Sequence, residues 1–309
     1  MSFRRMFLLT LSASLCLPLL SRADDADRAD SKDQPKPILV DLTIKGSVPE
    51  EPAPLGLEGE PLTDNLRSLT ETLKKAKDDP QVKGLVLRLR DLNIGLAKTN
   101  ELRQALADFR TSGKKTFAVM EEGGNAEYLI ASAADEIIMP ESGSLMIKGL
   151  AAEVLFYKKA FDKLGVKAQM MQVGEYKGAG EPYTRSEMSP EFEANLKGIL
   201  ADNYDMIAEA LAGRLKVDAA RAKELLENGP YTAESAKEAG LIDRVAYPDE
   251  VEDQVAEALE LEDPKLETKY GKNDKKTDFS GFAGFMKMMQ ALSGETAKKA
   301  ESKKPKVAL

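Results

Sequence analysis

The sequence predicts an α/β fold built on a mainly parallel sheet. Segments with strand character alternate with amphipathic helical segments through residues 37–262. Residues 82–89 are dense in apolar side chains, as in a strand that is covered on both faces. Repeated strand–helix–strand units are typical of parallel strands joined by right-handed crossovers.

Strands are expected wherever short apolar runs lie between turn residues. In the first run Ile38, Val40, Leu42 and Ile44 share one face. The strands at 136–139 and 241–245 are short, and the strand at 167–173 would deliver Lys177 to a loop. The expected strands are residues 37–48, 82–89, 115–120, 136–139, 167–173 and 241–245.

Helices are expected where apolar residues recur every three or four positions after a capping residue. Thr63 or Asp64 would cap the first helix, and Asp79-Pro80 would end it. Ser189 is a natural N-cap and Pro190 a natural first residue for the longest helix. The expected helices are residues 64–77, 100–111, 125–134, 150–164, 191–215, 217–227, 231–239 and 250–259.

The two ends of the chain differ in composition from the middle. Residues 1–23 have two adjacent arginines, Arg4 and Arg5, before an apolar run and a small-residue site, which indicates an export signal, either cleaved or kept as an anchor. Residues 24–36 are charged, which predicts a disordered linker before the folded region at 37–262. Residues 263–309 are a lysine-rich linker with an amphipathic segment at 279–292. Residues 305–309 resemble the opening of a strand, so a second half is expected to follow.

Composition excludes several kinds of site. The chain has no histidine, and its one cysteine, Cys16, lies in the signal segment, so a His-containing triad, a disulfide and a His- or Cys-ligated metal are excluded. No cofactor or metal is expected. The net charge is −8 without basic stripes, which argues against nucleic acid binding. A base acting near neutral pH must be Asp, Glu, Lys or Tyr.

Lys177 is the candidate general base. It lies in a glycine-flanked turn between the expected strand at 167–173 and the long helix. A lysine buried at such a place loses its proton more easily and becomes a general base. The simpler interpretation is an exposed lysine in a polar loop.

The stretch around Lys177 resembles a known motif. It reads Tyr176-Lys177-Gly178-Ala179-Gly180-Glu181-Pro182-Tyr183, followed by Met188-Ser189-Pro190. This is similar to the lysine motif of the signal peptide peptidase A (protease IV) family, peptidase family S49. Residues 155–158, 164–166 and 229–243 are similar as well, and the likeness runs from about residue 38 to 245. The chain looks like the N-terminal, lysine-bearing half of the long form.

The resemblance implies a Clp protease/crotonase-like fold of repeated β-β-α units. It also implies two tandem halves that assemble into an oligomer near the membrane, on the periplasmic side. The first half supplies a lysine base and the second a serine nucleophile. Carried over to this chain, Lys177 is the base, and its partners are peptides, a serine-bearing half or chain, and other copies of itself. Burial among apolar walls, with Tyr176 and Tyr183 as candidates, would lower the pKa of the lysine.

The nucleophile is where this sequence departs from the family pattern. The family's serine precedes two glycines and a tyrosine, whereas this chain reads Gly123-Gly124-Asn125-Ala126-Glu127-Tyr128. Asn125 therefore stands at the serine position. The backbone N–H groups of Gly123, Gly124 and Asn125 would suit a ligand oxyanion, but a glycine turn capped by Asn125 is the simpler interpretation. Only one glycine follows the second strand, where the family has an oxyanion pair. The nearby Ser132, Ser142 and Ser144 are expected to be structural.

Three functions are compatible with these observations. The first is half of a Ser/Lys endopeptidase that degrades cleaved signal peptides, with Lys177 activating a serine from another half or chain. The second is a catalytically incomplete scaffold that oligomerises and binds peptides. The third, a crotonase-like acyl-CoA enzyme, fits the fold, but the acidic charge, the missing glycine pair and the export signal disfavour it.

Overall fold

The computed structural model describes residues 36–51, 64–271, 284–286 and 289. The expected export signal, nearly all of the 24–36 linker, most of the amphipathic segment at 279–292 and the end at 305–309 lie outside the described residues. All described residues from Pro37 onward belong to one unit.

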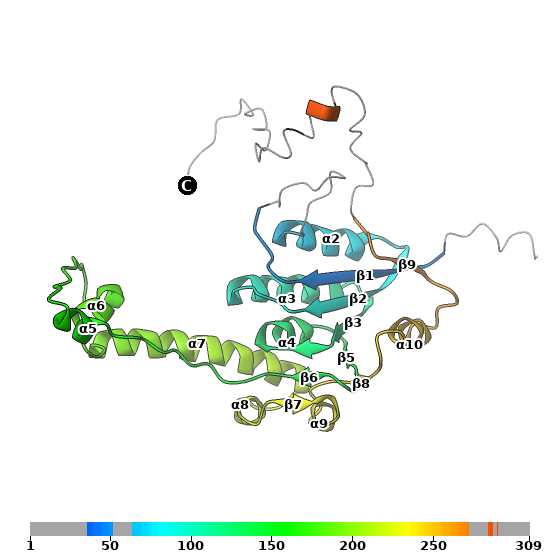
Figure 1. The fold of residues 1–309 in the computed structure, drawn as a ribbon. Helices are drawn as coiled ribbons and strands as arrows, with labels where there is room; N and C mark the ends of the chain where they lie inside the picture. The colour runs from blue at the N-terminus through cyan, green and yellow to red at the C-terminus, as the bar shows by residue number, and fades with distance from the viewer. Residues whose placement is uncertain (1–35, 52–63, 272–283, 287–288, 290–309) are drawn as a thin grey trace, which may run out of the picture. The chain divides into compact units, whose positions relative to one another are not determined.

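A six-stranded parallel sheet forms the centre of this unit (Figure 1). Its strand order is β8-β5-β3-β2-β1-β9, and each neighbouring pair is parallel. The predicted α/β class with a mainly parallel sheet is therefore confirmed. The strands are β1 (Ile38–Lys45), β2 (Val82–Arg90), β3 (Lys115–Met120), β5 (Glu136–Met139), β8 (Arg244–Val245) and β9 (Lys265–Glu267).

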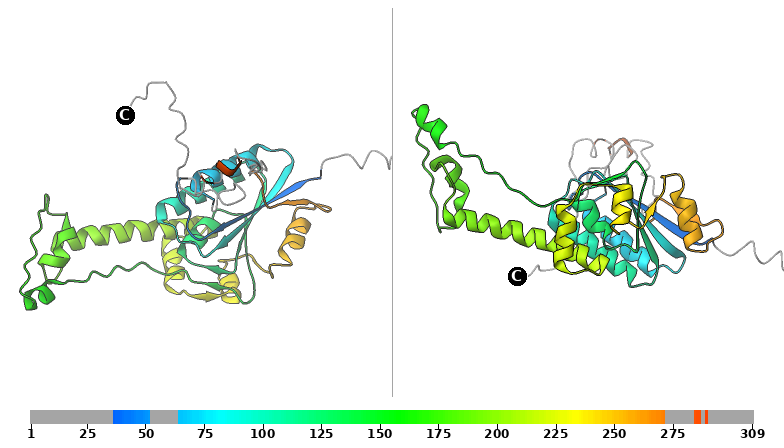
Figure 2. Two further views of the ribbon diagram at one scale, coloured as in Figure 1. Left: turned by 45° about the horizontal axis from the view of Figure 1, so that its top comes forward. Right: turned by 90° about the horizontal axis from the view of Figure 1, so that it is seen from below.

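Helices cover both faces of the sheet, which explains the apolar density of its strands. On one face α2 (Leu66–Asp78), α3 (Leu96–Arg110) and α4 (Asn125–Ala131) pack over the larger core. On the other face α10 (Val251–Ala258) covers a smaller core that includes Val86 and Phe117 (Figure 2). Alternate side chains of a strand point to opposite faces, so both must be apolar where both are covered.

A small second sheet lies beside the carboxyl ends of the main strands. It contains β4 (Glu122–Gly123), β6 (Ser144–Leu145) and β7 (Tyr231–Thr232). The β4–β6 pair is parallel and the β6–β7 pair antiparallel. The helices α8 (Ala219–Glu227) and α9 (Ala233–Glu238) flank β7 in the chain.

Residues 150–189 form a segment whose side chains are mostly exposed, which we call the arm. It contains α5 (Lys158–Lys163), a 3₁₀ turn at Gly178–Gly180 and α6 (Glu181–Thr184). It returns through α7 (Pro190–Leu215), whose buried residues Ile207, Ala208 and Leu211 all lie in its C-terminal third. The arm thus meets the N-terminal end of α7, and the opposite end of α7 packs in the core.

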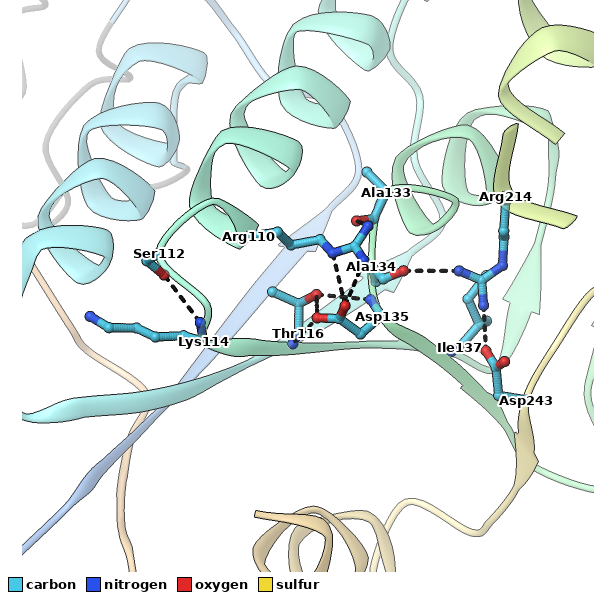
Figure 3. Close-up of polar contacts among 10 residues, drawn as sticks. All are labelled: Arg110, Ser112, Lys114, Thr116, Ala133, Ala134, Asp135, Ile137, Arg214 and Asp243. Atoms are coloured by element: carbon cyan, nitrogen blue, oxygen red, sulfur yellow. Dashed lines mark hydrogen bonds and ion pairs between the residues drawn. The ribbon is translucent and has the colours of Figure 1, made fainter. Parts of the chain in front are cut away.

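A polar network fixes the C-terminal end of α7 at the amino edge of the sheet (Figure 3). Arg214 donates to the carbonyl of Ala134 at 2.9 Å and to Asp243, which also accepts from the backbone of Ile137. From α3, Arg110 binds Asp135, whose other oxygen accepts from Thr116. The two arginines therefore neutralise carboxylates and satisfy carbonyls at the end of α4.

Several element predictions need correction. Asn65, not Thr63 or Asp64, caps α2, and α3 begins at Leu96 rather than at residue 100. The helix expected at 150–164 shortens to α5, and the strand expected at 167–173 is absent. No hydrogen-bonded neighbour lies alongside residues 167–173 in the described part of the chain, and a strand needs one. Conversely, β9 was not predicted, because its three residues become a strand only by pairing with β1.

Candidate functional site

Residues 174–189, which carry Lys177 and which we call the lysine loop, pack against the first turn of α7. Gly178 packs on Phe192 so closely that a Cβ there would lie 2.5 Å from the ring carbon Cγ. Ser189 caps α7 as predicted, since its hydroxyl accepts from the N–H of Phe192 at 3.1 Å. The same hydroxyl donates to the Glu181 carboxylate at 2.5 Å. The Ser189 hydroxyl is therefore engaged in two structural hydrogen bonds and is not a free nucleophile.

Lys177 itself is exposed on this loop. Its backbone N–H donates to Gly174 O at 3.2 Å. The expectation that apolar side chains of this chain would bury Lys177 is wrong for the described residues. Tyr176 is 59% exposed. Tyr183 instead stacks on Tyr157, with ring centroids 5.9 Å apart, and so helps to join α6 to α5.

The turn before α4 holds the other predicted residues. Asn125 does not cap the helix but is its first residue, and Gly124 precedes it in an extended conformation. The Asn125 carboxamide accepts from Lys148 N–H at 3.0 Å and donates to Lys148 O at 2.9 Å. Met146 N–H donates to Gly123 O at 2.6 Å. The Asn125 side chain thus binds both backbone groups of Lys148 and ties the turn before α4 to the segment that follows β6.

Glu127 is a site residue that sequence reasoning missed. It is buried, and its two carboxylate oxygens accept from Leu92 N–H at 2.6 Å and from Gly124 N–H at 3.0 Å. These donors come from the loop after β2 and the turn before α4. The Gly124 N–H is therefore engaged, and an anionic ligand beside it would face a carboxylate. A Glu three residues after a turn glycine was the available signal, because that is the capping-box position.

The structure does not bring Lys177 and Asn125 together within one chain. The lysine loop is attached at the start of α7, whereas Ile207, seventeen residues further on, is buried in the core cluster that contains Tyr128 of α4. At 1.5 Å per residue this separation is about 26 Å along the helix axis. Figure 1 shows the same arrangement, with α6 and α4 near opposite ends of α7.

The three nearby serines lie in different surroundings. Ser132 donates to Leu129 O at 2.7 Å at the end of α4, and Ser144 lies in β6. Ser142 borders an open pocket of about 480 Å³ at the carboxyl ends of β2 and β3. This pocket also contains Arg90 and Glu121, which form an ion pair at 2.8 Å, and its lining includes no lysine. No described helix is both long enough and apolar enough to span a bilayer.

Comparisons with known proteins identify related serine proteases. The sequence model of peptidase family S49 matches residues 108–262. The chain is 31% identical over 235 residues to the chloroplastic serine protease SPPA of Arabidopsis thaliana, covering 74% of this chain and 33% of that protein. It is 37% identical over 137 residues to Protease 4 of Haemophilus influenzae, covering 43% and 22%. The chain thus spans about a third or less of the length of these relatives.

Among solved structures, the S97A mutant of the 1510-N membrane-bound stomatin-specific protease is similar. The sequences are 16% identical, the match covers 72% of this chain and 86% of that one, and the TM-score is 0.39. This likeness is too distant to carry an argument about the site. The family model and the relatives named SPPA and Protease 4 confirm the resemblance to signal peptide peptidase A, and the chain belongs to peptidase family S49.

Proposed function

We infer that this chain is the base-supplying half of a Ser/Lys peptidase. Lys177 accepts a proton from a serine hydroxyl that a second half or another chain provides, and the substrates are peptides, cleaved signal peptides in particular. The reaction takes place on the outer side of the membrane across which the export signal would direct the chain. One observation carries this proposal: Lys177 is presented on an anchored, exposed loop, whereas the chain's own α4 turn is occupied by Asn125 and Glu127.

A partner chain would also bury Lys177, which is exposed in the single chain. Apolar side chains close to Lys177 in sequence are solvent-exposed, with Met171 fully exposed and Val173 at 90%. Such surfaces mark places where another protein packs. A partner that covered them would remove water from around Lys177 as well, and desolvation favours the neutral amine. The same contact would therefore bring the serine close and prepare the base.

The test uses the full chain purified in complex with a serine-bearing S49 partner. A fluorophosphonate probe reports how fast the partner's serine is activated. Lys177→Ala should slow labelling by about 100-fold or more, the usual contribution of a general base. Lys177→Arg should slow it equally, because a guanidinium does not release its proton near neutral pH. Lys167→Ala, an exposed lysine of the same arm, is the matched control.

The result also separates this proposal from the scaffold alternative. If Lys177→Arg labels at the rate of the unmodified complex, Lys177 is not the base. If the complex assembles and binds peptides but no serine in it reacts with the probe, the chain serves a non-catalytic assembly. Asn125, which puts an amide where the family has a hydroxyl, is the observation that keeps this alternative open.

A further inference from the structure

The described residues directly before Lys177 form no strand that could fix its position, so another group must do so. We propose that Glu181 is the positioning residue for Lys177, acting through Ser189 at the N-cap of α7. The proposal rests on the proposed role of Lys177 as base. Glu181 does not touch reacting atoms; it determines where the lysine lies.

Both carboxylate oxygens of Glu181 accept hydrogen bonds from one residue, Ser189. Its side chain is 6% exposed although the surrounding arm is mostly open to solvent. One oxygen accepts from Ser189 N–H at 2.7 Å and the other from Ser189 Oγ at 2.5 Å. Two hydrogen bonds to an ionised carboxylate define its orientation much more tightly than one.

Glu181 is linked to Lys177 through a single tight turn. The N–H of Glu181 donates to the carbonyl of Gly178, the residue immediately after Lys177. Gly178 has no space for a side chain, because the Phe192 ring fills it. The backbone that follows Lys177 is thus fixed by the Phe192 contact and by the Glu181–Ser189 pair. Since α7 is buried at its other end, the helix connects the position of Lys177 to the core.

The charge of Glu181 is part of this arrangement. Burial alone raises the pKa of the carboxyl, but the hydrogen bonds from Ser189 and the nearby Arg185 outweigh it, and the net pKa is lowered. The carboxylate therefore stays ionised at neutral pH. Glu181→Gln keeps the size of the side chain but places an NH₂ group where Ser189 offers N–H and O–H donors. Both hydrogen bonds then lose an ionised acceptor, and the Ser189 hydroxyl must turn from donor to acceptor to bind the NH₂ group.

The experiment combines two readouts on the complex with the serine-bearing partner. Hydrogen exchange of residues 174–189 reports the order of the loop, and fluorophosphonate labelling reports activation of the serine. Glu181→Gln should raise exchange at least tenfold and slow labelling at least tenfold, because small displacements of a catalytic group reduce rates steeply. Glu187→Gln, an exposed glutamate of the same loop, should change neither.

A double-mutant cycle distinguishes a residue that positions Lys177 from one that only stabilises the loop or the complex. Glu181→Gln should slow labelling when Lys177 is present but add nothing to Lys177→Ala. An equal loss in both backgrounds would show that Glu181 supports assembly and would overturn the proposal, as would unchanged exchange of the loop. If Lys177→Ala labels normally, the proposed function fails, and Glu181 is then judged on loop exchange alone. In that case, an unchanged hydrogen-exchange rate in Glu181→Gln would show that Glu181 does not order the lysine loop. A raised exchange rate would show that it does.

Discussion

Replacing Glu127 by alanine tests the buried side chain that links the α4 turn to the loop after β2. The buried carboxylate accepts from Leu92 N–H at 2.6 Å and from Gly124 N–H at 3.0 Å. A hydrogen bond to a charged group contributes about 1.5–3 kcal/mol, and removing the acceptor leaves both donors without it. Because Leu92 and Gly124 are only half-buried, water can accept from their N–H groups and recover part of the lost hydrogen-bond energy. We expect Glu127→Ala to lower the free energy of unfolding by about 3 kcal/mol.

Urea denaturation measures this change as a shift in midpoint at constant slope. The control is Glu121→Ala, because Glu121 is 51% exposed and paired with the exposed Arg90. An exposed pair of this kind contributes about 0.2–1 kcal/mol. If Glu127→Ala destabilises the chain no more than Glu121→Ala does, then Glu127 does not hold the two loops together, and our account of the α4 turn is wrong.

Three further predictions follow from other contacts. Lys114→Met should lower the unfolding free energy by about 2 kcal/mol in a denaturant titration, because the ammonium donates to three carbonyls at the end of α2; a change below about 0.5 kcal/mol would contradict this. Burial raises the pKa of Asp135, but the hydrogen bonds from Thr116 and Arg110 lower the pKa by more than burial raises it, so the net pKa is lowered. The stability lost in Asp135→Asn should therefore be complete at neutral pH and shrink as pH falls below about 4, a trend that midpoints measured from pH 7 to 3 would show or exclude. Asn125→Ser should speed exchange of the Lys148 amide yet give no fluorophosphonate-reactive serine in this chain; labelling at position 125 would refute the second part.

Much of the fold was predictable because it depends on local pattern. Alternating and continuous apolar runs located five strands of the parallel sheet, and Ser189-Pro190 located the start of α7. The absence of histidine limited the possible bases, and the motif around Lys177 led to the family. Each of these features is a property of neighbouring residues, so it can be read along the chain.

The tertiary structure decided the features that need two distant segments. Residues 167–173 have strand character but no strand partner in the part of the chain that the structure describes, whereas Lys265–Glu267 gains one in β1. The carboxamide of Asn125 binds a residue 23 positions away, and the carboxylate of Glu127 binds one 35 positions away. The sequence left Lys177 either exposed or buried, and the tertiary structure decided for exposure, because burial depends on which surfaces the whole chain places around a side chain. Hydrogen bonds and burial are relations between segments, and only folding brings those segments together.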